Sequence, residues 1–313
     1  MSSGRGSLQT DISRKHNSAK TLRYGDIDDY RIVKLLGEGR FGKIYECIGM
    51  KDEEKSLVVK ILKPCDQRTF KQEVYALTTL TQCPQIPKIV DVISHPVTFQ
   101  NSIVTENING INLKAVMYDF EISETIQFSY QLLQGLKYAH SNKIIHKDIK
   151  PQNIIVNRSN RRLNIVDWGS SEFIKNPGKK HASLHYRAPE LLLQHYYSYP
   201  VDIWAFGCVL LSIVTKKCPF FNGLDINNQL ESIINILGTD VFFEYVDRHH
   251  VKLNDYYCKY KRDIRPRCWR TIVGGDKQTD LISLLDGILQ FDPDNRFDAE
   301  NALKHHLFYN VYS

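Results

Sequence analysis

The stretch His146-Lys147-Asp148-Ile149-Lys150-Pro151-Gln152-Asn153, followed later by Asp167-Trp168-Gly169, decides the fold and the chemistry of this chain. Asp148 stands where it can accept the proton of a hydroxyl group, and Lys150 stands close enough to neutralise a phosphoryl group in transfer. A surface hairpin with local turns is the alternative, but it would not explain the spacing of the whole set. The pattern therefore predicts phosphoryl-transfer chemistry.

Two short apolar runs, 154–156 and 163–166, surround a polar turn and predict a β-hairpin. Because residues 153 and 167 are equally far from residue 160, we expect Asn153 and Asp167 to face each other at the open end of this hairpin. Their amide and carboxylate oxygens are ligands of the kind that Mg²⁺ prefers. The two residues are therefore a predicted metal site.

The segment Gly37-Glu38-Gly39-Arg40-Phe41-Gly42-Lys43-Ile44 contains a complete G-x-G-x-x-G pattern. Glycines in such a pattern let the backbone approach phosphate oxygens. A dinucleotide-binding site needs a helix after the third glycine, whereas residues 43–48 alternate like a strand, so we expect the loop to lie in a hairpin. Taken alone, the pattern is equally consistent with a plain turn.

Lys60, within Val58-Val59-Lys60-Ile61-Leu62, is a charge inside an apolar run and needs a partner of opposite charge. Glu73 borders the apolar stripe of a predicted helix at 67–80 and points inward. We expect the two side chains to pair. A purely structural ion pair is the simpler alternative, but the nearby glycine pattern favours a lysine that orients phosphate.

Local patterns divide the chain into a strand-rich first part and a helical second part. The first three strands should form an antiparallel meander, and strands are expected at 31–36, 43–48, 56–62 and around 103–106. Further helices are expected at 123–140, 201–214, 227–237 and 280–289. Residues 1–23 are rich in Ser and Gly, with five basic residues against one acid, and should form a flexible tail.

Composition and charge exclude several classes of protein. Of the 313 residues, 42% are hydrophobic and 24% are charged, which is typical of a globular chain. The seven cysteines are scattered without a C-x-x-C pair, so neither a disulfide framework nor a zinc site is indicated. No apolar run approaches the ~20 residues of a membrane span, and the start lacks the apolar core of a secretory signal. We therefore expect an intracellular protein without a membrane partner, and a formal charge of +6 is too modest to indicate nucleic-acid binding.

Together, these motifs resemble the signature of the eukaryotic protein kinases over about residues 30–308. The resemblance extends to Ala188-Pro189-Glu190, Asp202-Ile203-Trp204 and Arg296. It implies an α+β, bilobal protein-kinase fold, with an antiparallel β-sheet N-lobe, a mostly helical C-lobe and a buried salt bridge between Glu190 and Arg296. The implied boundaries are a flexible basic tail at 1–26, an N-lobe at 27–106, a hinge at 107–109 and a C-lobe at 110–313.

The same resemblance implies a role for each residue of the site. ATP and Mg²⁺ would be the cofactors, and the catalytic residues would be Asp148, Lys150, Lys60 and Glu73. Asn153 and Asp167 would be the metal ligands. The nucleotide-binding residues would be Leu36, Gly37, Glu38, Gly39, Arg40, Phe41, Gly42, Lys43, Ile44, Val58, Lys60, Glu106, Ile108, Ile155 and Val166.

Within that superfamily the chain is most similar to the catalytic alpha subunits of casein kinase II, in the CMGC group. The similarity rests on Asp28-Asp29-Tyr30, on residues 58–64, on the passage 219–239, and on Trp168, where most kinases carry Phe, with Glu172-Phe173 after it. It implies a serine/threonine kinase of the nucleus and cytoplasm that is constitutively active, prefers acidic sequence contexts and accepts GTP as well as ATP. A proline-directed CMGC kinase and a kinase-fold binding module are the alternatives.

The partners implied by this family are acidic Ser/Thr protein substrates and a regulatory beta subunit, which would form a tetrameric holoenzyme. The beta subunit would dock on the outer face of the N-terminal sheet at Tyr45, Val59 and Ile61. A positive field along the expected path of the substrate peptide comes from Lys175, Lys179, Lys180 and Arg187.

The chain departs from the family at two places that bear on function. The helix bearing Glu73 begins with only Arg68 and Lys71, where the family has a dense lysine run, which weakens the expected grip on acidic substrates. Lys147 stands where many kinases have the arginine that clamps an activation-loop phosphate. Because lysine lacks the bidentate fork of arginine, we expect the enzyme to need no such phosphate.

Overall fold

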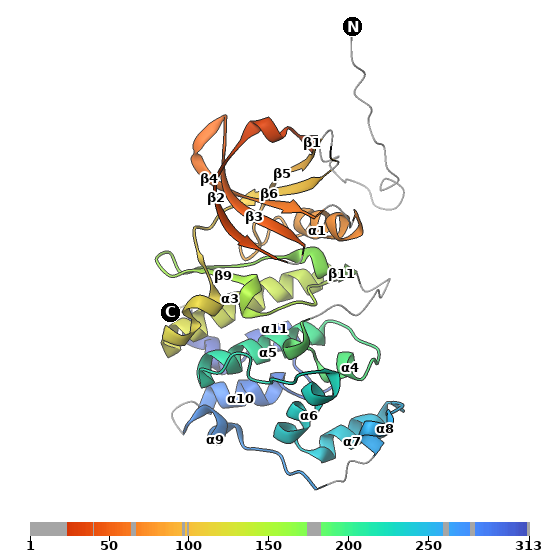
Figure 1. Ribbon diagram of the computed structural model, residues 1–313. Helices are drawn as coiled ribbons and strands as arrows, with labels where there is room; N and C mark the ends of the chain where they lie inside the picture. The colour runs from red at the N-terminus through yellow and green to blue at the C-terminus, as the bar shows by residue number, and fades with distance from the viewer. Residues whose placement is uncertain are drawn as a thin grey trace.

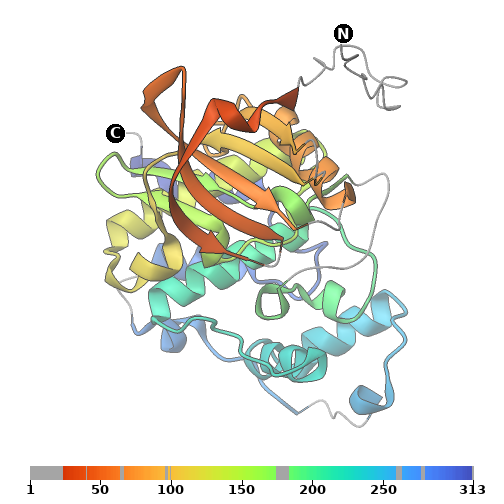
Figure 2. The same ribbon diagram turned by 45° about the horizontal axis from the view of Figure 1, so that its top comes forward.

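The computed structural model describes residues 24–39, 41–63, 67–95, 98, 100–173, 183–258, 263–275 and 279–311. These residues form two parts, a sheet with one helix beside it and a larger group of helices (Figure 1). Figure 2 shows the same two parts in a turned view, with the strands of the sheet in red and orange and the later helices in cyan and blue. The predicted bilobal α+β architecture is therefore confirmed.

The N-terminal part is a six-stranded sheet with the strand order β1-β5-β6-β4-β3-β2. Strands β2, β3 and β4 pair antiparallel in sequence order, which confirms the predicted meander. Helix α1 follows the meander and buries Phe70, Glu73 and Leu77 among its inward-facing residues. The elements are β1 (Tyr24–Gly25), β2 (Tyr30–Glu38), β3 (Gly42–Gly49), β4 (Asp52–Leu62), α1 (Gln67–Thr79), β5 (Ile89–Ser94) and β6 (Asn101–Glu106).

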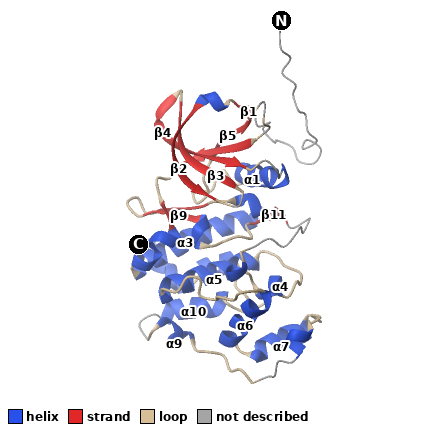
Figure 3. Ribbon diagram, in the orientation of Figure 1, coloured by secondary structure: helices blue, strands red, loops and turns tan. Residues whose placement is uncertain are grey.

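Helices dominate the C-terminal part, as Figure 3 shows in blue. Two small sheets, β10-β9-β7 and β11-β8, belong to it as well. The elements are β7 (Ile111–Asn112), α2 (Leu113–Val116), α3 (Ile122–Ser141), β8 (Ile144–Ile145), β9 (Ile154–Asn157), β10 (Arg162–Ile165), β11 (Glu172–Phe173), α4 (Pro189–Leu192), α5 (Pro200–Thr215), α6 (Ile226–Leu237), α7 (Thr239–Arg248), α8 (Asp255–Cys258), α9 (Trp269–Val273), α10 (Thr279–Ile288) and α11 (Ala299–Leu303). None of the helices in the described ranges combines the length and the apolar character that crossing a membrane requires.

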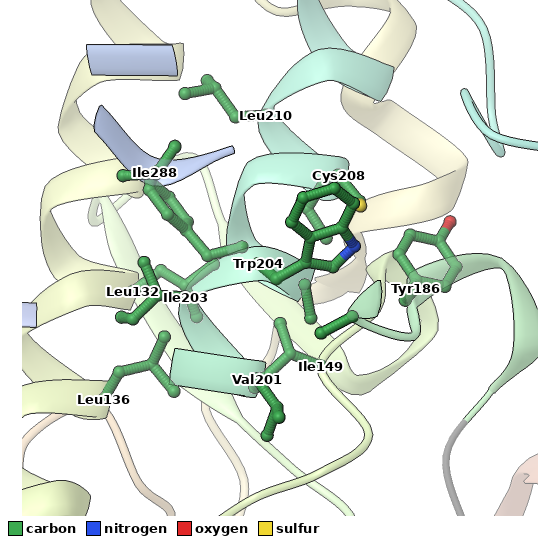
Figure 4. Packing of buried hydrophobic residues seen from close by; sticks show 14 of the residues in the cluster. Leu132, Leu136, Ile149, Tyr186, Val201, Ile203, Trp204, Cys208, Leu210 and Ile288 are labelled. Carbon is green, nitrogen blue, oxygen red and sulfur yellow. The ribbon is translucent and has the colours of Figure 1, made fainter. Parts of the chain in front are cut away.

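Helix α5 is the centre of the C-terminal core because its sequence is apolar around nearly its whole circumference. Every residue from Val201 to Ile213 is buried. Pro200 lies in the first turn, where the missing N–H of a proline is not needed. Figure 4 shows Trp204 of this helix among packed side chains that include Leu132 of α3 and Ile288 of α10. This rigid core supports the loops that carry the chemistry.

The hairpin of β9 and β10 forms where the sequence predicts it, but its register differs by one residue. Asn157 pairs with Arg162, so Asn153 lies opposite Val166, whose N–H donates to the Asn153 carbonyl oxygen at 2.9 Å. Asp167 comes one residue later. The turn causes the difference, because the Asn157 side chain accepts hydrogen bonds from the backbone N–H groups two and three residues further on.

A second, smaller apolar cluster lies on the face of the sheet opposite to Val58 and Lys60, since side chains alternate along a strand. It contains Val59, which is only 1% exposed, and Tyr45 and Ile61 pack against it. Val59 is therefore buried within the fold, and Ile27 from the segment before β2 and Tyr30, the first residue of β2, also pack against this cluster. Docking of a regulatory beta subunit stays a prediction.

Candidate active site

A cavity of about 990 Å³ lies between the N-terminal sheet and the hairpin of β9 and β10. The predicted catalytic and metal residues Lys60, Glu73, Asp148, Lys150, Asn153 and Asp167 all line it. Its walls also contain most of the predicted nucleotide residues, namely Leu36, Gly37, Glu38, Gly39, Phe41, Ile44, Val58, Glu106, Ile108, Ile155 and Val166. Arg40 lies outside the described residues. The fold thus brings the separate sequence motifs to one place.

Gly42 and Lys43, which the resemblance places among the nucleotide-binding residues, are not among the residues that line the cavity. A Cβ atom at Gly42 would lie 2.1 Å from the carbonyl oxygen of Ile61, so this glycine is needed where β3 packs against β4. The Lys43 side chain is exposed, with its Nζ atom 4.0 Å from a carboxylate oxygen of Glu38. The third glycine therefore serves strand pairing, and the lysine after it faces solvent.

Lys60 connects two carboxylates inside the cavity. Its Nζ atom lies 2.8 Å from both carboxylate oxygens of Glu73 and 2.6 Å from Asp167 Oδ1. The predicted pairing of Lys60 with Glu73 is therefore formed. Burial alone would lower the pKa of Lys60, but the two carboxylates outweigh it and hold that pKa above its usual value. The lysine keeps its positive charge at the place where phosphates would lie.

Asp167 is held in a strained backbone conformation by the packing of the next residue. Its φ of 63° and ψ of 62° are left-handed, which is uncommon for a residue other than glycine. Trp168 is fully buried, and its indole N–H donates to the carbonyl oxygen of Ile165 at 3.0 Å. Burial would raise the pKa of Asp167, but the Lys60 ammonium outweighs it and holds that pKa below its usual range. An ionised carboxylate thus faces the cavity.

The Asp148 carboxylate is held by three donors. Its Oδ2 atom accepts from Lys150 Nζ at 2.7 Å and from Asn153 Nδ2 at 3.1 Å, while its Oδ1 atom accepts from the backbone N–H of Ser183 at 3.0 Å. Lys150 Nζ also donates to the Ser183 hydroxyl at 2.9 Å. Ser183 was not among the predicted site residues, because the fold brings it to Asp148 across 35 positions of sequence.

The backbone of loop 146–153 is fastened by Asp202, a buried carboxylate in α5. Its two oxygens accept from the N–H groups of His146 and Lys147 at 2.8 Å each, and one of them also lies 2.9 Å from His140 Nε2. Burial raises the pKa of Asp202, but His140 outweighs that effect and the pKa lies below its usual value. The sequence signal for this role was available, since a charge within an apolar helix needs partners.

The oxygen donors of the cavity suit a divalent cation. Asn153 uses its amide N–H₂ group on the backbone oxygen and the carboxylate of Asp148, which leaves its amide oxygen as a ligand. Asp167 adds an ionised carboxylate that is 24% exposed. Hard oxygen ligands of this kind, completed by water and phosphate, match the coordination chemistry of Mg²⁺. The two predicted metal residues therefore fit such an ion.

Among the predicted peptide-binding residues, only Arg187 belongs to the described part of the chain. Lys175, Lys179 and Lys180 lie outside it. Arg187 lines the cavity, and burial lowers the pKa of its guanidinium from the usual value while the charge of Asp148 opposes that effect. One of the four predicted cations thus lies near the Asp148 carboxylate.

Lys60 is largely buried at the cavity, with a side chain that is 12% exposed, and a fixed carboxylate and a second lysine line the same cavity. Such a set suits the transfer of a phosphoryl group to a hydroxyl. The fold and the site therefore define a nucleotide-dependent phosphotransferase. The family model of the protein kinase domain matches residues 30–308, and the chain belongs to this family. Membership implies ATP and a divalent metal ion in general as the reagents of the site.

Proposed function

We propose that this protein is a serine/threonine protein kinase that transfers the γ-phosphoryl group of ATP to Ser or Thr in acidic sequence contexts, in the manner of the casein kinase II alpha subunits. The observation that supports it best is the contact of Lys150 with both the Asp148 carboxylate and the Ser183 hydroxyl. A short aliphatic hydroxyl already fits beside the proton acceptor and its cation. A serine or threonine of a substrate has the same chemistry.

Asp148 is the proton acceptor in this proposal, because hydrogen bonds to both of its oxygens fix its position. The substrate hydroxyl oxygen forms a bond to the γ-phosphorus while the bond from phosphorus to the bridging oxygen of ADP breaks, and the hydroxyl proton passes to Asp148. Lys60 binds the phosphates that stay on ADP, and Lys150 neutralises charge on the transferring group. Asn153 and Asp167 would hold Mg²⁺, which neutralises phosphate charge when it is bound.

A peptide-library phosphorylation assay with the purified protein tests this function. Transfer to Ser or Thr flanked by acidic residues supports it. Transfer mainly to sites followed by proline would identify a proline-directed kinase, and transfer to tyrosine would exclude the Ser/Thr assignment. Nucleotide binding without any transfer would favour a kinase-fold binding module, an alternative that the presence of Lys60, Asp148 and Asp167 disfavours.

The acidic preference can be tested by reversing charge at Lys179 and Lys180. We expect the double variant Lys179→Glu, Lys180→Glu to raise KM for an acidic peptide several-fold with kcat largely unchanged, because a charge pair that water and salt screen contributes only about 0.2–1 kcal/mol. Initial rates at low and high salt measure the effect, which salt should weaken. The matched control, Lys252→Glu with Lys304→Glu, makes the same change of net charge at two exposed positions of the helical part. If both double variants keep the wild-type KM, the acidic preference does not come from these lysines.

GTP is expected to replace ATP as a phosphoryl donor. The apolar side chains that line the cavity include Val58, Ile155 and Val166. Apolar side chains can pack against the ring faces of adenine and guanine alike. Contacts with the purine edge would come from the backbone of the segment 105–108. Turnover measured with each nucleotide and the same peptide decides the matter, with Asp148→Asn protein as the background. A GTP rate equal to that background would show that the cavity selects ATP.

A further inference from the structure

A buried ion pair between Lys147 and Glu172 lies next to the site and takes no part in the mechanism above. Lys147 Nζ lies 2.6 Å from Glu172 Oε2, and the two side chains are 4% and 5% exposed. The Tyr197 hydroxyl donates to the same carboxylate oxygen at 2.6 Å, and the Lys147 ammonium lies 5.3 Å from the centre of the Tyr197 ring. Charged groups are rarely buried this deeply unless they are paired, and removing one member of a buried pair leaves the other without its counter-charge.

These three residues, here named the Lys147–Glu172–Tyr197 clamp, connect three separate segments. Lys147 directly precedes Asp148 in the loop 146–153. Glu172 belongs to β11, which pairs antiparallel with β8, and Tyr197 follows helix α4. The clamp therefore ties the loop of the proton acceptor to the first strand after Asp167 and to the segment that leads into α5.

The clamp also reaches the N-terminal part through the neighbour of Glu172. The ring of Phe173 packs edge-on against Tyr75 of α1, with ring centres 4.5 Å apart. Helix α1 carries Glu73, the partner of Lys60. A single short strand, β11, thus touches both the helix that positions the phosphate-binding lysine and the loop that positions the proton acceptor.

An activating phosphate acts by pairing with a cation near the proton acceptor and so ordering the segment that carries it. In this chain the cation in that place is Lys147, whose ammonium already contacts the Glu172 carboxylate inside the protein. The ammonium group of lysine is a compact charge, and it lacks the planar set of donors with which an arginine guanidinium binds a phosphate in a bidentate manner. A phosphate would have to displace Glu172, which would leave a buried carboxylate without its counter-charge.

We propose that Glu172 and Tyr197 are positioning residues that stand in for an activating phosphate, so that loop 146–153 takes up its active geometry on folding. The inference rests on the proposed kinase function and names the residues that keep loop 146–153 in its active geometry without a phosphate. The backbone of Lys147 is consistent with this, since its φ of 69° is a conformation that persists only where the surroundings hold it. Asp202 holds the backbone of this residue, and Glu172 holds its side chain.

The main test replaces Glu172 by Gln, which keeps the shape of the side chain and removes the counter-charge of Lys147. We expect kcat to fall about 10-fold to 100-fold, because a small displacement of a catalytic group has effects of this size. KM for ATP should change little, since Lys60, Glu73 and Asp167 are untouched. The neutral double variant Lys147→Gln, Glu172→Gln leaves no unpaired buried charge. It should therefore keep a larger fraction of the wild-type kcat than the product of the fractions that the two single variants keep.

Glu231→Gln is the matched control, because Glu231 also accepts a hydrogen bond from a tyrosine hydroxyl, that of Tyr256 at 2.7 Å, but on the exposed surface. Its kcat should equal that of the wild type. Amide hydrogen exchange gives a readout that does not depend on activity, and the ladder amides of β8 and β11 should exchange faster in Glu172→Gln than in the control. Wild-type protein treated with phosphatase should keep its full kcat.

Unchanged kcat together with unchanged exchange in Glu172→Gln would overturn the proposal, and so would loss of wild-type activity after phosphatase treatment. If the wild type phosphorylates no Ser/Thr peptide, the proposed function fails, and the exchange measurement still decides the role of the clamp. If Glu172→Gln does not fold, the neutral double variant and Tyr197→Phe take its place. Wild-type behaviour of both would then overturn the inference.

Discussion

Replacing Asp148 by alanine is expected to lower kcat by a factor of about 10² or more, because the acceptor hydroxyl loses the group that takes its proton. Asp148→Asn is the sharper variant. It keeps the volume of the side chain and can still accept a hydrogen bond from Lys150, yet an amide cannot take up the proton. Steady-state kinetics should show the loss in kcat with little change in KM for ATP, since the missing interaction belongs to the transition state.

Thermal unfolding of the same proteins separates catalysis from folding. Lys150 keeps the Ser183 hydroxyl as a partner when Asp148 is changed, so we expect melting temperatures close to that of the wild type. The matched control is Asp225→Asn, which alters a carboxylate that caps α6 and should leave kcat unchanged. An Asp148→Asn protein as active as the wild type would mean that another group accepts the proton.

The second large effect is expected from Arg296→Met, which should lower the free energy of unfolding by about 3–5 kcal/mol. Arg296 and Glu190 form the buried salt bridge that the kinase resemblance implies, with N–O distances of 2.8 and 3.1 Å and no exposure of either side chain. The guanidinium also donates to the carbonyl oxygens of Pro200, Gln290 and Phe291. Its removal therefore leaves the buried Glu190 carboxylate without a counter-charge and several buried carbonyl oxygens without a hydrogen-bond donor. Since a domain is stable by only about 5–15 kcal/mol, chemical denaturation should detect this loss easily.

An exposed pair of the same chemistry is the control for Arg296. Arg158 holds Glu124 with two bonds of 2.6 Å, but its side chain is 43% exposed, so water replaces the lost contacts. Arg158→Met should therefore cost much less stability than Arg296→Met. Equal losses in the two variants would mean that burial does not govern the strength of these pairs. Arg296→Lys should also destabilise, because lysine cannot reach the same set of acceptors.

The elements of this fold could be predicted because their causes act over a few residues. The helix predicted at 67–80 is α1 at Gln67–Thr79, and the one predicted at 201–214 is α5 at Pro200–Thr215. Apolar periodicity, proline and turn-forming residues mark such boundaries locally. The pairing of Lys60 with Glu73 could be predicted as well, because a charge within an apolar strand needs a nearby counter-charge.

Other features of the site depend on contacts between distant segments. Gly42 belongs to the glycine pattern, but the backbone of β4 is what requires it to be glycine. Asn153 is one residue out of the expected register because of hydrogen bonds in the turn at Asn157. No local pattern indicates that Glu172 meets Lys147, which is 25 positions away.

The sequence alone was thus sufficient to predict the kinase fold and the types of group that perform the chemistry. Glycine, proline and charges within apolar segments each constrain the chain at their own position. Packing settled which of these groups meet. Ser183 reaches Lys150, and Lys147 is paired with Glu172, because strands, helices and loops come together across the core. Such distances are set by how whole elements fit against each other, and that fit depends on the side chains of many distant residues at once.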